Sequence, residues 1–285
     1  MSRIPSDFQF SQQNLQDFTD CRRRFQLRYL EQVAWPAVEA EPLLEHEAHM
    51  QAGEAFHRVV QRYLLGVPVE RLSAIVESSS DPKSSLPRWW GNFLAYAGVT
   101  PADNSLVESV LAARLGDYRL IGKFDLVRWQ VDRSNLRVTI YDWKTSLKRP
   151  THDWLADRLQ TRIYPYLVMK VGPRYFGLEE LAAEQVEMIY WFAEYPREPH
   201  RFSYSPEQYQ ADGDFLGELL VEISNLSADD FHRTPDESRC RFCTYRSLCD
   251  RGVKAGLYDP EAMDLDVEES YDISLDFDQI AEIEF

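Results

Sequence analysis

Three consecutive stretches of the sequence alternate apolar and polar residues, which is the pattern of β-strands with one buried face. The connections between them are short and turn-like, GD at 116–117 and DRSN at 132–135. Short connections favour antiparallel neighbours, because parallel strands need a long crossover. The predicted strands are residues 105–115, 118–131 and 135–145. The sequence therefore predicts an antiparallel meander near its middle.

Segments with the helical spacing of apolar residues lie before and after this meander. Ser11 is a suitable N-cap for the first segment, and Ser205 with Pro206 suits the start of the last. The predicted helices are residues 11–33, 46–65, 153–172 and 205–228, and a further strand is predicted at 184–196. This order, with helices on either side of the strands in the chain, predicts an α/β fold.

The third strand of the meander ends with a carboxylate and an ammonium two residues apart. Asp142 and Lys144 are at positions i and i+2, so their side chains point to the same face of a strand. A surface ion pair is the simpler interpretation of this spacing, and such pairs contribute only about 0–1 kcal/mol. The other polar residues of the predicted sheet decide between this interpretation and a functional site.

Asp125 lies inside the second predicted strand, where an unpaired carboxylate would be costly. If the second and third strands are neighbours, Asp125 can face Asp142. Two buried acids repel each other unless they share a proton or a cation. Oxygen ligands suit Mg²⁺ or Mn²⁺. Glu108, on the first strand, is either a third acid of this site or an exposed residue, since strand faces cannot be fixed from sequence.

Three more polar residues lie on predicted helices near this constellation. His57 is usually explained as a structural helical histidine, although as a nitrogen ligand it would favour Mn²⁺. Gln160 and Tyr164 are four residues apart and share one face of the helix that follows the meander. As a pair they give a weak signal, and they could orient Lys144.

The four cysteines have an unusual distribution. Cys21 stands alone, whereas Cys240, Cys243 and Cys249 form C-x2-C-x5-C. Four thiolates can hold an iron–sulfur cluster, which fits this spacing better than the paired knuckles typical of zinc. Unligated core cysteines are a third possibility. A shared site would join the N-terminal helix to the C-terminal region.

Arginines accompany both groups of cysteines. They either offset the negative charge of metal-bound thiolates or contact phosphates, since the guanidinium fork matches phosphate oxygens. The candidate phosphate contacts are Arg22, Arg23, Arg24, Arg241 and Arg246.

The net charge of −16 is concentrated at the C-terminus. Residues 259–285 contain 11 acidic residues and no Lys or Arg, which leaves 36 acidic and 31 basic residues in the body. The body therefore does not exclude a nucleic-acid partner, and the tail is expected to be disordered. No apolar run reaches membrane-spanning length and the start lacks a signal-peptide core, so we expect a cytoplasmic protein without a membrane partner.

Taken in order, these motifs resemble the PD-(D/E)XK nuclease superfamily, and within it the RecB-like branch. The resemblance covers about residues 10–251. It rests on GEAFH with His57, then Glu108, GKFD, DWK, QTRIY and the split cysteine set. That set is similar to the iron–sulfur form found in CRISPR-associated RecB-like exonucleases and AddB-type nuclease domains. The resemblance implies a restriction-endonuclease-like core, with a central mixed sheet flanked by helices. It also replaces the surface-pair interpretation of Asp142 and Lys144.

The resemblance also implies roles for individual residues. The expected metal ligands are His57, Asp125, Asp142 and the carbonyl of Trp143. Lys144 would activate water and stabilise charge on the phosphate, and the other expected members of the catalytic site are Glu108, Gln160 and Tyr164. A 4Fe–4S cluster would be held by Cys21, Cys240, Cys243 and Cys249.

The function expected from this resemblance is metal-dependent hydrolysis of DNA, as an exonuclease on single strands or ends, in repair, recombination or CRISPR adaptation. A helicase or another repair protein is the expected protein partner, since the chain has no nucleotide-binding G-x-x-x-x-G-K-[ST] motif. The alternatives are an iron–sulfur DNA-binding scaffold without turnover, an RNA-processing nuclease of the same fold and a structural zinc protein.

The expected division of the chain has four parts. Residues 1–45 carry the first cysteine, 46–200 form the nuclease core, 201–258 carry the last helix and the cysteine trio, and 259–285 are the acidic tail.

Overall fold

A computed structural model describes residues 4–34, 43–79, 84–96, 99–132, 135–241 and 243–252. The predicted acidic tail and the centre of the predicted DRSN turn lie outside the described residues. No helix in the described part of the chain is long and apolar enough to cross a membrane.

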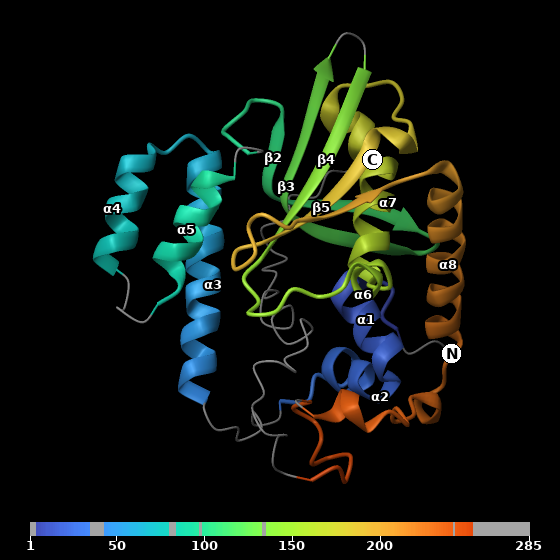
Figure 1. Cartoon of the computed structure of the whole chain (residues 1–285). Coiled ribbons are helices and arrows are strands. Elements are labelled where there is room, and N and C mark those ends of the chain that lie inside the picture. The colour runs from blue at the N-terminus through green and yellow to red at the C-terminus, as the bar shows by residue number, and fades with distance from the viewer. Residues whose placement is uncertain are drawn as a thin grey trace.

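In the described part of the chain, six strands form one mixed sheet (Figure 1). The strands are β1 (Gln9–Ser11), β2 (Ser105–Leu115), β3 (Tyr118–Asp132), β4 (Asn135–Lys144), β5 (Val186–Phe192) and β6 (His200–Ser203). The predicted meander is confirmed, because β2 pairs antiparallel with β3 and β3 pairs antiparallel with β4. Strand β5 continues the sheet parallel to β4, and β6 closes it antiparallel to β5.

Helices cover both faces of the sheet, as predicted (Figure 1). The helices are α1 (Gln12–Asp20), α2 (Arg22–Phe25), η1 (Gln26–Leu30, a π-helix), α3 (Leu43–Leu64), α4 (Val69–Ser79), α5 (Leu86–Ala95), α6 (His152–Ala156), α7 (Leu159–Phe176) and α8 (Pro206–Asn225). Short 3-10 turns follow at η2 (Ala183–Gln185), η3 (Ala228–Asp230) and η4 (Glu237–Cys240). One hydrophobic core lies between the sheet and α1, α7 and α8, and a second lies between the sheet and α3, α4 and α5. The mixed sheet flanked by helices is consistent with a restriction-endonuclease-like fold.

Local sequence explains where several helices begin and end. Ser11 caps α1 in a reciprocal capping box with Asn14, and Ser205 caps α8 by accepting a hydrogen bond from the N–H of Gln208. Helix α7 ends where Gly177 adopts φ +68°, a left-handed conformation that favours glycine. Both predicted N-caps are confirmed.

Two predicted helices are interrupted in the structure. The helix predicted at 11–33 breaks at Cys21, whose extended backbone (φ −162°) separates α1 from α2. The helix predicted at 153–172 is divided at 157–158 into α6 and α7, and Pro165 lies inside α7. The sequence did not reveal the three-residue strand β1, which is too short to show a period of two.

Candidate metal centre

Two strands, β1 and β4, pair with the same edge of β3, and a short segment of β3 between them is left unpaired. Strand β1 pairs with β3 in parallel as far as Ile121, and β4 pairs with it antiparallel from Leu126 onward. The residues between, 122–125, have no pairing strand on this edge, and their sequence is the GKFD motif. The side chain of Tyr164 instead reaches the unpaired backbone here, and the candidate metal ligands gather at this point.

His57, Glu108 and Asp125 form a compact group of metal-binding side chains from α3, β2 and β3. One ligand atom of each lies within 4.8 Å of the others. His57 Nδ1 is 3.3 Å from Asp125 Oδ1 and 3.7 Å from Glu108 Oε1. All three side chains are less than a quarter exposed. An imidazole nitrogen with two carboxylates suits Mn²⁺ and Mg²⁺, so the donor set fits a divalent metal.

The alternation of side chains between the two faces of the sheet is irregular next to the metal centre, on both β2 and β3. Phe124 belongs to the core on the α7 side, whereas Leu126, two residues later, belongs to the core on the α3 side. The usual alternation of faces is therefore broken at Asp125. On β2, Glu108 lies at the matching position and has φ +46°, which is rare for a residue other than glycine. Strained backbone of this kind is concentrated at functional sites.

Asp142, Lys144 and Gln160 form a second, adjoining network on the α7 side. The Nζ of Lys144 is 3.0 Å from Asp142 Oδ2 and donates a hydrogen bond of 3.1 Å to Gln160 Oε1. The Gln160 Nε2 donates a hydrogen bond of 2.6 Å to Asp142 Oδ1. All three side chains are buried. Gln160 therefore fixes both partners, since its amide donates to one and accepts from the other.

Trp143 and Tyr164 donate hydrogen bonds to a carboxylate and a carbonyl of the unpaired segment of β3. The N–H of Trp143 donates a hydrogen bond of 2.7 Å to Asp125 Oδ2, which links the two networks. The hydroxyl of Tyr164 donates to the carbonyl of Lys123 at 2.5 Å, and its ring packs on Phe124. Tyr164 thus replaces a strand partner on the open edge of β3.

Electrostatics keep Asp125 ionised and Tyr164 protonated. Burial alone would raise the pKa of Asp125, but the neighbouring His57, the N–H of Trp143 and the charge of Lys144 together hold it below its ordinary value. Burial, with the nearby charge of Asp142, raises the pKa of Tyr164 well above its ordinary value. Asp125 is therefore available as an anionic ligand, and Tyr164 keeps the phenolic proton that it donates to the carbonyl of Lys123.

The structure groups the predicted site residues differently from the sequence. The tight group contains Glu108, which was expected in the catalytic site but not among the metal ligands, together with His57 and Asp125. Asp142 takes its partners from the α7 side and is not part of that group among the described residues. Lys123 was not predicted, although it lies two residues before Asp125; its Nζ is 3.2 Å from Glu108 Oε2.

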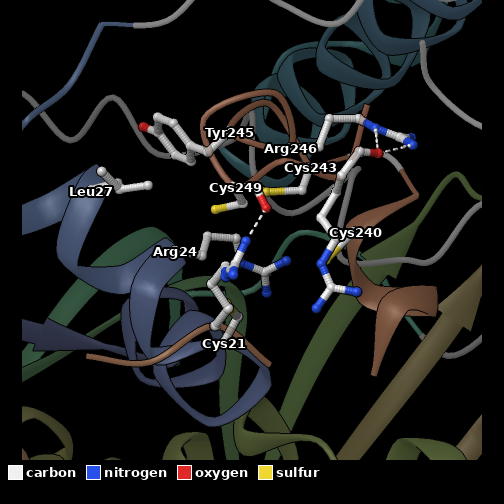
Figure 2. A pocket seen from close by; sticks show the side chains of 10 residues that line it. Cys21, Arg24, Leu27, Cys240, Cys243, Tyr245, Arg246 and Cys249 are labelled. Carbon is white, nitrogen blue, oxygen red and sulfur yellow. Dashed lines mark hydrogen bonds between the residues drawn. The ribbon is translucent and has the colours of Figure 1, made fainter. Parts of the chain in front are cut away.

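The four cysteines line one pocket between the N-terminal helices and the C-terminal segment (Figure 2). All four are free thiols. Burial raises the pKa of Cys243 to about 11 and also raises those of Cys240 and Cys249, so these groups are protonated near neutral pH without a metal. A metal or cluster would have to displace those protons.

The sulfur atoms are not gathered as tightly as a single zinc ion requires. In a tetrahedral zinc site, Zn–S bonds of about 2.3 Å place the sulfurs about 3.8 Å apart. Within the described residues, no trio of metal-binding side chains that includes a cysteine comes within 4.8 Å. A cubane cluster spaces its thiolates more widely, because each binds a different iron. Within the described residues no tight cysteine group supports the predicted 4Fe–4S site, although the four thiols share one pocket, and the cluster stays a prediction.

Most of the arginines predicted to contact DNA are engaged within the protein. Arg22 pairs with Glu222, Arg23 with Gln26 and Glu31, and Arg24 with Asp17 and Asp20. Arg246 donates hydrogen bonds to the carbonyl oxygens of residues 241, 251 and 252. Arg241 is exposed. Their contact with DNA stays a prediction.

Comparison with protein families identifies the chain. Its sequence matches the profile of the PD-(D/E)XK nuclease superfamily over residues 9–250, which is most of its length. The chain belongs to the PD-(D/E)XK nuclease superfamily. No curated protein sequence matches it.

Two solved structures are similar to this PD-(D/E)XK chain at low sequence identity. The protein SSO0001 is 11% identical, with a TM-score of 0.38 and 86% of this chain and 87% of that chain covered. A protein of Eubacterium rectale described as a putative exonuclease is 9% identical, with a TM-score of 0.44 and coverages of 80% and 84%. The family assignment rests on the profile match.

Membership in the PD-(D/E)XK superfamily gives the site its chemistry. Nucleases of this superfamily use divalent metals to hydrolyse phosphodiesters, and this chain has a group of possible metal ligands, the buried Asp125 with the partly buried His57 and Glu108. Membership in a nuclease family indicates a nucleic-acid substrate.

Proposed function

We propose that this protein is a divalent-metal-dependent DNA nuclease of the RecB-like branch, acting as an exonuclease on single-stranded DNA or DNA ends in the cytoplasm. The observation that carries the proposal is the compact His57, Glu108 and Asp125 group beside the buried Asp142 and Lys144 pair. Repair, recombination or CRISPR adaptation is the proposed setting, with a helicase or another repair protein as partner.

The residues of the chain divide the chemistry between them. His57, Glu108 and Asp125 would hold the metal, with Asp142 and the carbonyl of Trp143 as further candidate ligands. When bound, the metal lowers the pKa of water and binds a phosphate oxygen. Lys144 places a positive charge beside the reacting phosphate. Gln160 keeps Lys144 and Asp142 in position through its two hydrogen bonds.

We further propose that Cys21, Cys240, Cys243 and Cys249 hold a 4Fe–4S cluster. The proposal is supported by the pocket that the four thiols share and by their split spacing in the sequence. Its role would be structural, because it joins segments that are far apart in the chain.

The proposed activity is tested with end-labelled single-stranded and double-stranded DNA, in Mn²⁺ and in EDTA, using protein purified without oxygen. We expect metal-dependent release of labelled nucleotides from DNA ends by the wild type. Lys144→Ala and the near-isosteric Lys144→Met should both lose this activity while keeping the wild-type circular dichroism spectrum. A circular DNA substrate separates exonuclease from endonuclease action, and an RNA of the same sequence tests the choice of sugar. Equal cleavage by the wild type and both variants would contradict the proposed site.

A further inference from the structure

Lys123 brings a second ammonium group to the metal centre, at the open segment of β3. Its Nζ is 3.2 Å from Glu108 Oε2, while the other carboxylate oxygen of Glu108 faces His57. The Lys123 side chain is 29% exposed, whereas that of Glu108 is 12% exposed. The ammonium therefore contacts a candidate ligand from the solvent side of the group.

In the absence of nucleic acid, the position of Lys123 disfavours binding of a metal. An ammonium this close to a ligand carboxylate competes with a divalent cation for the same negative charge. Lys144 differs, because it lies on the α7 side and is held by both Asp142 and Gln160. Since the backbone of Lys123 is fixed by the Tyr164 hydrogen bond, only its flexible side chain can leave Glu108.

We propose that Lys123 is a substrate-contacting residue that exchanges its partner Glu108 for a backbone phosphate of the nucleic acid. This inference rests on the proposed nuclease function. Once a divalent cation binds Glu108, less of the negative charge of Glu108 is available to the Lys123 ammonium, and a phosphate at the same centre offers it an additional anion. Lys123 thereby couples metal binding to binding of the nucleic-acid backbone, separately from Lys144.

The coupling predicts effects of opposite sign for Lys123→Ala. The affinity for Mn²⁺ without DNA should rise several-fold, because a competing cation is gone. The affinity for single-stranded DNA in the presence of metal should fall. The slope of log K against log salt should become shallower by about 0.7, which corresponds to one lost phosphate contact on a single strand.

The experiment measures both affinities on the full-length protein. Mn²⁺ binding is followed by titration calorimetry, and binding of a short labelled deoxythymidine oligonucleotide is followed by fluorescence anisotropy in Ca²⁺ at several salt concentrations. Lys123→Arg should restore the salt slope. Lys170→Ala is the matched control, because Lys170 lies on α7 ten residues after Gln160, about 15 Å along the helix, where it contacts the rings of Tyr166 and Tyr209. It should change neither affinity.

The possible results separate the two proposals. Tighter Mn²⁺ binding with an unchanged salt slope would overturn the phosphate contact, since Lys123 would then influence only the metal. Parallel loss of both affinities without rescue by Lys123→Arg would overturn it as well, because that result indicates a structural role. If the wild type binds no DNA in the presence of metal, the proposed function itself fails, and the inference fails with it.

Discussion

At the scale of single residues, one amide controls the arrangement of two charged groups. Gln160 donates to Asp142 and accepts from Lys144, and the Lys144–Asp142 pair closes the triangle. A neutral amide is the side chain that can serve an anion and a cation at once without adding charge. The network is buried, so any added charge in it would be poorly screened.

Gln160→Glu should therefore reduce nuclease activity more than Gln160→Ala. The new carboxylate would face Asp142 and compete for Lys144, and two adjacent acids raise the pKa of one of them. We expect the pH–rate profile of Gln160→Glu to shift relative to that of the wild type, whereas Gln160→Ala should lower the rate at all pH values. Identical profiles for the two variants would contradict an electrostatic role for Gln160.

Asp212 is a second buried carboxylate, and it lies away from the metal centre. It accepts hydrogen bonds from Tyr204 and Gln208, and Arg162 is 3.5 Å away. Burial raises its pKa despite these partners. A raised folded-state pKa means that its stabilising contribution is complete below the unfolded pKa, near 3.8, and is lost as the pH rises through the folded value.

Asp212→Asn should remove this pH dependence. At acidic pH both side chains are neutral, and the two proteins should differ little in unfolding free energy. As the pH rises toward neutral, the wild type ionises a buried group and the variant does not, so the variant should gain relative stability. Urea unfolding across this pH range measures the difference. A difference that is constant with pH would show that ionisation of Asp212 costs the fold nothing.

At the scale of elements, the metal centre depends on a local break in two neighbouring strands. Glu108 on β2 has a left-handed backbone, and opposite it the alternation of β3 is broken at Asp125. A conformation of this kind costs on the order of 1–3 kcal/mol for a residue with a side chain. The strain turns the Glu108 carboxylate toward His57 and Lys123.

The strain at Glu108 can be separated from the role of its carboxylate by comparing two variants. Glu108→Ala and Glu108→Gly both remove the carboxylate, and both should weaken Mn²⁺ binding. Only glycine accepts φ +46° without cost, so Glu108→Gly should be more stable than Glu108→Ala by about 1 kcal/mol. At an ordinary strand position glycine is less stable than alanine, so the expected order of stability is the opposite of the usual one. Thermal unfolding without metal provides the test, and a less stable glycine variant would exclude backbone strain at this residue.

At the scale of the whole molecule, segments from the two ends of the described chain pack together (Figure 1). The N–H of Arg23 donates to the carbonyl of His232, and the Tyr245 hydroxyl donates to the carbonyl of Val33. Phe25 also stacks on Phe231, with ring centroids 6.2 Å apart. These contacts join the two segments in addition to any metal or cluster at the cysteines.

Loss of the proposed cluster should loosen the C-terminal segment, which then keeps only these contacts, without unfolding the nuclease core. Cys21→Ser should abolish the iron content and the visible absorption of anaerobically purified protein, and it should speed amide hydrogen exchange in residues 228–252. The amides of β3 to β5 should keep their protection. Tyr245→Phe is the control, because it removes the hydrogen bond to Val33 and leaves all four thiols. Wild-type protein that contains zinc, or no metal, at these cysteines would contradict the cluster.

The fold was predictable where the signal lies within one segment. Alternation over 10 or more residues located β2, β3 and β4, and the caps at Ser11 and Ser205 fixed two helix starts. The motifs GKFD and DWK indicated a metal site on adjacent strands. Strand β1 escaped detection because it has three residues and gains its stability from pairing with β3, more than 100 positions away.

The sequence alone determined the strands of the meander, the residue types available for a metal and the cysteine spacing. Only the tertiary structure decided that Glu108 joins His57 and Asp125, and that Lys123 lies against them. A period of two predicts which residues share a face only while the alternation is regular. At Glu108 a single positive φ interrupts it, and that conformation is held by long-range pairing and packing, which local sequence does not encode.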